Sequence, residues 1–224
     1  MTELPPNIKE RLLAEIDSAR SLTRPQGIAR RLAWAGIGLV MVAGGALMNG
    51  LPIATASRPM SYLLVCSGLT LVTAILASAW ILSSGRSSLG RSSRSLRGLA
   101  VAVPVALALG VLAGNLAAPG TWQAPHREWV AHLMCLALYF ELGAALLLVS
   151  LFGVRPLDPI APSTTGAALG AAVGAWTTFA VATQCPLADP THALPTHIAP
   201  AILLVGVGLV AGPRVLGFRY RVRR

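Results

Sequence analysis

Long apolar runs alternate with short polar segments along the whole chain, and each run is long enough for a membrane-spanning helix. About 17 to 25 mainly apolar residues cross a hydrocarbon layer about 30 Å thick when they form an α-helix. Strands of a membrane barrel would instead alternate apolar and polar residues with a period of two. Six windows without Lys or Arg meet the helical requirement, near residues 33–53, 60–83, 98–118, 129–152, 164–183 and 196–212. We therefore predict an all-α fold, a polytopic membrane protein with a bundle of six transmembrane helices.

Basic residues gather at alternate ends of these predicted spans. The chain has 224 residues, 54% of them hydrophobic, and a net charge of +10. All but two of its 18 Lys and Arg residues lie before span one, between spans two and three, between spans four and five, or after span six; the exceptions are Arg58 and Arg127. The positive-inside rule then places both termini in the cytoplasm. A basic tail also suits nucleic acid, but an anchor at the membrane surface explains it with fewer assumptions.

This topology divides the chain into a cytoplasmic N-terminal segment, a transmembrane domain and a basic cytoplasmic tail, at residues 1–32, 33–212 and 213–224. The first segment is too short for a core of its own. Asn7 is a helix-capping residue type, and the helix that would follow has one apolar face, formed by Ile8, Leu12, Leu13 and Ile16. We predict that this face binds a cytoplasmic protein, and the alternative is a helix lying on lipid or on the bundle itself.

Small residues mark two further segments. Gly166, Gly170 and Gly174 recur every four residues in span five, so they form a bare strip that lets another helix approach closely. Packing within the bundle is the first interpretation of this strip, and dimerisation is the second. The segment from Ser83 to Arg97 is rich in Ser, Gly and Arg, so we expect a flexible, solvated loop there.

The sequence contains no recognised enzyme motif. It has no Gly-rich phosphate loop, no His-Glu-x-x-His and no Gly-x-Ser-x-Gly. We therefore predict that the protein is not an enzyme. Glu141 lies near the middle of span four, where an ionised carboxylate is costly, so it should face the bundle and be protonated or paired. A small inner-membrane transporter is the alternative function, with Glu141 as the residue on which flux would depend.

Cysteine and histidine residues fall on the outer side of the predicted topology. They are Cys66, Cys135, Cys185, His126, His132, His192 and His197. Within span four, Glu128, His132, Cys135 and Tyr139 are spaced by four, three and four residues, so they share one helical face. This face forms a polar stripe that descends from the outer surface.

Three interpretations of these residues remain open. Cys135 and Cys185 form a redox couple, because thiols on the outer side meet an oxidising compartment. Alternatively Cys185 binds zinc or another soft metal with His132, His192 and His197, although their spacing matches no standard site. In the third interpretation the cysteines are small buried hydrophobes and the histidines are polar loop or interface residues.

Several of these features occur together in one known family. The run Met134-Cys135-Leu136, the Gly- and Ala-rich span five, Cys185-Pro186 after it, and a Gly-rich last span with a basic tail resemble the NrsF-like membrane anti-sigma factors. The resemblance covers about residues 33–218 and is clearest from 130 to 215. The family's paired cysteines correspond to Cys135 and Cys185. Gln184 stands where family members often have His, which weakens the case for a metal ligand at that position.

The resemblance implies a function that the residues alone do not. It implies a six-span protein of the bacterial inner membrane whose cytoplasmic N-terminal region holds an extracytoplasmic-function sigma factor. Release would follow a redox, metal or light-linked oxidative signal at the outer half of the bundle. The partners expected are therefore a sigma factor and membrane lipid, with no direct contact to nucleic acid.

Overall fold

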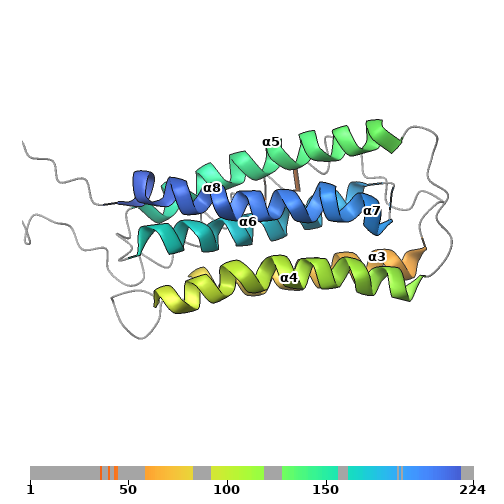
Figure 1. Cartoon of the computed structure of the whole chain (residues 1–224), viewed down its shortest axis with the longest axis horizontal. Helices are drawn as coiled ribbons and strands as arrows, with labels where there is room; N and C mark the ends of the chain where they lie inside the picture. The colour runs from red at the N-terminus through yellow and green to blue at the C-terminus, as the bar shows by residue number, and fades with distance from the viewer. Residues whose placement is uncertain are drawn as a thin grey trace, which may run out of the picture.

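The computed structural model describes residues 59–82, 92–118, 128–155, 161–185, 187 and 189–217, together with four isolated helical positions at residues 36, 40, 43 and 44. The predicted first span, the N-terminal segment and the end of the basic tail therefore lie almost wholly outside the described residues. All regular structure in the described part is helical, as expected (Figure 1). The helices are α3 (Met60–Leu82), α4 (Ser93–Ala117), α5 (Glu128–Val154), α6 (Pro162–Gln184), α7 (Pro190–Ala193), the π-helix η2 (Leu194–Ile198) and α8 (Ala199–Leu216).

Five helical segments in the described part are long and apolar enough to cross a membrane. They are Met60–Ile81, Ser93–Ala117, His132–Val154, Pro162–Gln184 and Pro190–Leu216. Large apolar side chains are exposed on their outward faces, among them Leu64, Val101 and Leu116. Such faces are expected where a helix meets lipid. These findings confirm the all-α class and support a membrane protein, while the sixth span and the orientation stay predictions.

Two predicted boundaries are wrong. Helix α4 begins at Ser93, so the end of the expected Ser83–Arg97 loop is helical. The reason is local, because the Ser92 hydroxyl accepts a hydrogen bond from the Ser95 amide at 3.3 Å and caps the helix. The last predicted span, 196–212, is also too short at its start, since the continuous helical stretch begins at Pro190.

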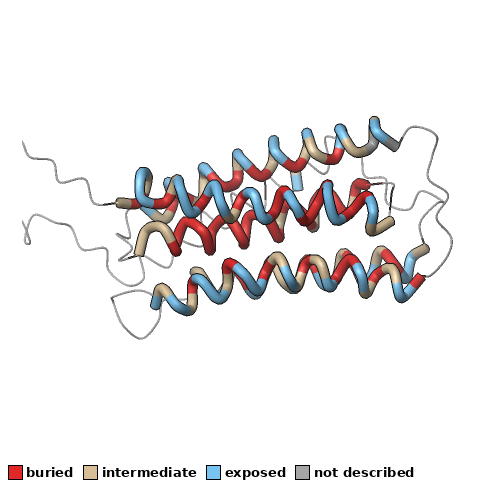
Figure 2. The backbone as a smooth tube through the Cα atoms, viewed as in Figure 1, coloured by how far each residue is buried: buried red, intermediate tan, exposed pale blue. Residues whose placement is uncertain are grey.

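Helix α6 is the centre of the described bundle. Its side chains are buried along almost its whole length, whereas α3, α4, α5 and α8 each show exposed faces (Figure 2). It contacts all four of these helices, most extensively α8. Polar tethers add to this packing, since the Trp176 indole N–H donates to Ser78 Oγ of α3 at 2.8 Å.

The predicted glycine strip packs against another helix of the same chain. A Cβ atom added at Gly166 would collide with the backbone of Gly208, and one at Gly170 would collide with the backbone of Leu204. A Cβ at Gly174 would lie 3.1 Å from that of Ala201. The first interpretation, packing within the bundle, is confirmed, and the close approach fixes α6 and α8 relative to each other.

Candidate functional site

Four buried side chains from separate segments converge at one end of the bundle. They are Cys135 of α5, Cys185 at the end of α6, His192 of α7 and His197 of η2. One sulfur or ring nitrogen from each lies within 4.8 Å of those of the other three. This is the end at which α5 starts and α7 lies (Figure 1). We call these four residues the Cys/His cluster.

Cys185 reaches the cluster because the chain leaves the helical conformation there. It is the C-cap of α6, with extended backbone angles, and its amide donates to the carbonyl of Val181 at 2.8 Å. The next helix then starts close by, because Asp189 accepts a hydrogen bond from the amide of Thr191 at 3.1 Å and Pro190 occupies the first turn. The short connection brings His192 back beside Cys185.

A π-helical turn aligns the two histidines. Residues five apart on an α-helix point about 140° away from each other, given about 3.6 residues per turn. In η2 the amide of Ala199 donates to the carbonyl of Leu194, five residues earlier, and this wider turn stacks residues five apart. Pro195 lacks an amide hydrogen, which removes one α-helical bond from this stretch. His192 and His197 therefore lie in a buried helical stretch that begins at Pro190, two residues before His192.

Short polar contacts join members of the cluster. Cys185 Sγ lies 3.2 Å from His192 Nε2 and 3.4 Å from the carbonyl oxygen of Leu187. A hydrogen bond from Cys135 and the two neighbouring imidazoles lowers the pKa of the Cys185 thiol far below its usual value, although burial acts in the opposite direction. The structure thus favours the thiolate at Cys185, the form that binds metals and reacts with oxidants.

The imidazole rings are packed but not fully hydrogen-bonded. His192 Nδ1 and His197 Nε2 are buried and have no hydrogen-bond partner among the described residues. A buried polar atom without a partner costs about 1 to 3 kcal/mol. His132 contacts the cluster edge-on, with its ring centroid 4.3 Å from that of His192, and the centroids of His192 and His197 are 5.5 Å apart.

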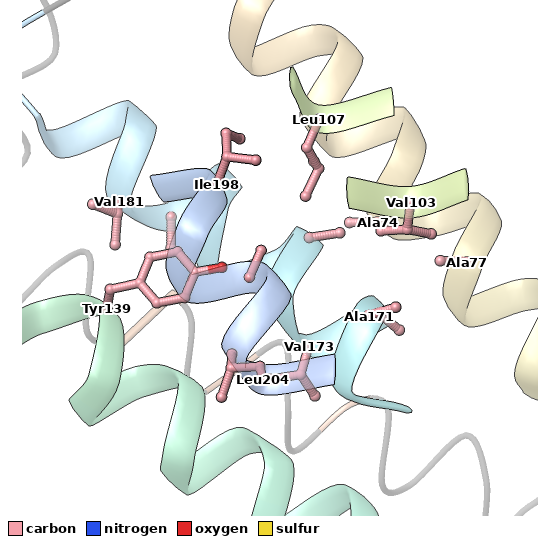
Figure 3. Packing of buried hydrophobic residues seen from close by; sticks show 14 of the residues in the cluster. Ala74, Ala77, Val103, Leu107, Tyr139, Ala171, Val173, Val181, Ile198 and Leu204 are labelled. Carbon is pink, nitrogen blue, oxygen red and sulfur yellow. The ribbon is translucent and has the colours of Figure 1, made fainter. Parts of the chain in front are cut away.

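A series of hydrogen bonds lies next to the Cys/His cluster. The Tyr139 hydroxyl donates to the carbonyl of Gly174 at 2.8 Å and lies 3.1 Å from the Thr178 hydroxyl, which in turn donates to the carbonyl of His197 at 3.3 Å. Figure 3 shows the Tyr139 ring reaching from α5 across to α6 and the last helical stretch. This series ties three segments together directly beside the cluster. Thr178 was missed by the sequence analysis, whereas Tyr139 belonged to the predicted polar stripe.

The structure combines two of the earlier interpretations. The expected redox couple, Cys135 and Cys185, and the expected metal ligands Cys185, His192 and His197 share a single site. His132 packs against His192 but is not one of the four grouped ligands. Cys135 is the fourth member of the group instead. All three cysteines, including Cys66, are buried, and none of them forms a disulfide.

The remaining predicted residues divide into two kinds. Glu141 was expected to face the bundle, but its side chain is exposed on α5, so that expectation is wrong for the described helices. Its place two residues after the buried Tyr139 turns it to another side of α5. The predicted partner-binding face at Ile8, Leu12, Leu13 and Ile16, and also His126, lie outside the described residues.

Comparison with known proteins gives one match. A family model described as NrsF, negative regulator of sigma F, matches residues 16–218. No curated protein matches the chain. No solved structure matches it either.

Proposed function

Because the chain belongs to the NrsF family of negative regulators of sigma F, we propose that it is a membrane-bound anti-sigma factor that sequesters an extracytoplasmic-function sigma factor. The family match over residues 16–218 is the observation that carries this proposal. Five helices able to cross a membrane support the membrane location, and the charge pattern supports an inner-membrane orientation with both termini in the cytoplasm. Sequestration keeps the sigma factor at the membrane and away from RNA polymerase.

The N-terminal segment holds the sigma factor. Residues 1–32 contain the largest soluble stretch of the predicted topology, and their apolar side chains gather on one face of a predicted helix. An amphipathic helix that lays such a face into a groove is a common way for a short segment to bind a protein. Charges on its other face keep the free helix soluble and favour a protein groove over lipid.

The Cys/His cluster is the sensor. It joins the N-terminal part of α5 and the C-terminal end of α6 to the start of the last helical stretch, so a change in its bonding acts on three segments at once. The signal is redox, metal or light-linked oxidative chemistry at the two thiols. Movement passes along the tightly packed α6 and α8 toward the other end of the bundle. The bundle then has two arrangements, one that holds the sigma factor and one that releases it. The signal can shift the balance between them only by the difference in free energy with which it favours one over the other.

Co-purification with the sigma factor tests sequestration. Replacing Leu12 and Ile16 with Asp should abolish capture while the protein still enters the membrane, because burying each charge in an apolar groove costs several kcal/mol. Ala14→Asp with Ser18→Asp is the matched control, since it adds the same two charges at the same spacing on the opposite side of the predicted helix. The control should capture the sigma factor normally.

Unchanged capture by the Leu12 and Ile16 variant would move the binding site to another part of the chain. Loss of capture in both variants would point to charge and not to an apolar face. The alternative function, a small transporter, predicts solute flux that depends on Glu141. No described contact favours it, since Glu141 is exposed on the outside of α5.

A further inference from the structure

The Cys/His cluster has the composition and geometry of a metal site. We propose that Cys135, Cys185, His192 and His197 together bind one zinc-class divalent ion with tetrahedral coordination. This deepens the proposed function by naming a ligand of the sensing site, and it rests on that function only for the link to sigma-factor release. The proposed metal binding itself depends only on residues that the structure describes, and not on the sigma factor.

The distances suit a single ion. Zinc bonds to sulfur at about 2.3 Å and to imidazole nitrogen at about 2.0 to 2.1 Å, so tetrahedral ligand atoms lie roughly 3.3 to 3.8 Å apart. Here all four ligand atoms lie within 4.8 Å of one another, and Cys185 Sγ lies 3.2 Å from His192 Nε2. The widest pairs therefore need to close by roughly 1 Å on metal binding. Rotation of the side chains can supply that movement.

The donor types select the metal class. Two thiolates and two imidazoles in a compact group are typical of tetrahedral zinc, whereas magnesium and calcium require oxygen ligands. All four donors come from the protein, which is the pattern of a closed site that holds structure and not of a catalytic site with an open position. A filled site would hold α5, α6 and the last helical stretch at fixed distances.

Simple packing explains the cluster less well. Cys66 is also buried, but it lies beside Gly114 of α4 and outside the group of four. In the cluster, two imidazoles are nearly fully buried and two of their ring nitrogens have no partner. Burial of polar rings without full pairing is costly, and a metal bound through His197 Nε2 would offset that cost at His197.

The surroundings hold the ligands in place. The π-helical turn orients His192 and His197 to one side, and the Thr178 hydroxyl fixes the carbonyl of His197. The ring of His132 rests edge-on against that of His192. These contacts restrict the movement of the two histidines. We assign His132 as a positioning residue and not as a ligand.

Metal titration of the full chain in detergent tests the site. The purified, chelator-treated protein should bind one Co²⁺ with the visible bands of tetrahedral cobalt and a thiolate charge-transfer band, and Zn²⁺ should displace it. X-ray absorption of the zinc-loaded wild-type protein should show two sulfur and two nitrogen ligands, a result that needs no variant to fold. An octahedral cobalt spectrum, a ligand set without sulfur, or no binding would overturn the proposal.

Variants assign the individual ligands. Cys185→Ser and His197→Ala should each weaken zinc binding by more than about 100-fold, the upper end of what losing a supporting contact causes. Cys66→Ser is the matched control and should bind zinc as the wild type does. His132→Phe keeps a ring edge against His192, so it should keep tetrahedral binding, whereas loss of the metal would make His132 a ligand and overturn the four-residue set.

Sigma-factor capture, measured on the same samples, separates this inference from the proposed function. Zinc binding without capture of a sigma factor would leave the metal site intact and refute the anti-sigma function. Capture of a sigma factor without zinc binding would refute the metal site and leave the anti-sigma function intact.

Discussion

Replacing Gly170 with alanine should separate the two most closely packed helices. A Cβ at this position would lie closer than 3.0 Å to three backbone atoms of α8, including the Cα of Val205 at 2.9 Å, where ordinary contacts are 3.4 to 4 Å. Backbone atoms cannot rotate away as the end of a side chain can. Helix α8 must therefore retreat by roughly 0.5 to 1 Å, which forfeits a quarter to a half of the dispersion energy of the affected contacts.

The loss of stability in Gly170→Ala can be compared with the effect of the same substitution at a second glycine. Overpacking of this kind costs about 1 to 3 kcal/mol, and the rigid backbone neighbours place Gly170→Ala in the upper part of that range. Alanine also favours a helix over glycine by up to about 1 kcal/mol. Gly206→Ala receives that gain without the clash, because nothing lies within 4 Å of an added Cβ on the exposed side of α8. The two variants should therefore differ by about 2 to 3 kcal/mol in the free energy of unfolding.

Thiol labelling during heating measures the difference. Because Cys66, Cys135 and Cys185 are all buried, a thiol-reactive dye should label them only as the helices open. At about 2 to 4 °C per kcal/mol for a chain of this size, Gly170→Ala should melt roughly 4 to 12 °C below Gly206→Ala. Equal melting temperatures would refute the close approach of α6 and α8. A lower zinc affinity in Gly170→Ala alone would further show that this packing supports the cluster.

Three further outcomes are expected. Tyr139→Phe removes a buried hydroxyl that donates to a carbonyl of α6, so it should lower stability by about 1 to 3 kcal/mol and weaken zinc binding, as melting and metal titration would show. Reporter fusions at residue 90 should read cytoplasmic and those at residue 190 external, and the opposite pattern would contradict the positive-inside assignment. Changing Cys135 and Cys185 to Ser should leave the sigma factor held in the presence of oxidant or metal; a normal response in reporter assays would place the sensor elsewhere.

Features that depend on periodicity could be predicted from the sequence. Helix class followed from apolar runs of the right length, and the contact face of α6 followed from glycines repeated every four residues. Cys135 and Tyr139 were placed on one face by their spacing, and both are buried in the structure. In each case the relevant geometry lies within one regular helix, so counting residues was enough.

Features that depend on irregular backbone could not be predicted in the same way. His192 and His197 share a face only because η2 is a π-helix, and their spacing in an α-helix would separate them. The two thiols meet the histidines only because the chain turns back toward the bundle after Cys185. Glu141 was assigned to the interior from the cost of a buried charge, but its helix turns that position outward. Such outcomes follow from helix rotation, which neighbouring helices decide.

Burial of α6 has a consequence for how the chain is made. Its mean hydropathy is lower than that of the other four candidate spans, although 89% of its apolar window is buried, far more than in any of them. A segment of Gly, Ala and Thr gains little from lipid contact, so its entry into a bilayer depends on neighbours that cover it. Helix α8 provides the closest cover and is synthesised after α6. A chain cut before Pro190 should therefore insert α6 poorly, because the helix that covers the least apolar of the described spans is then missing.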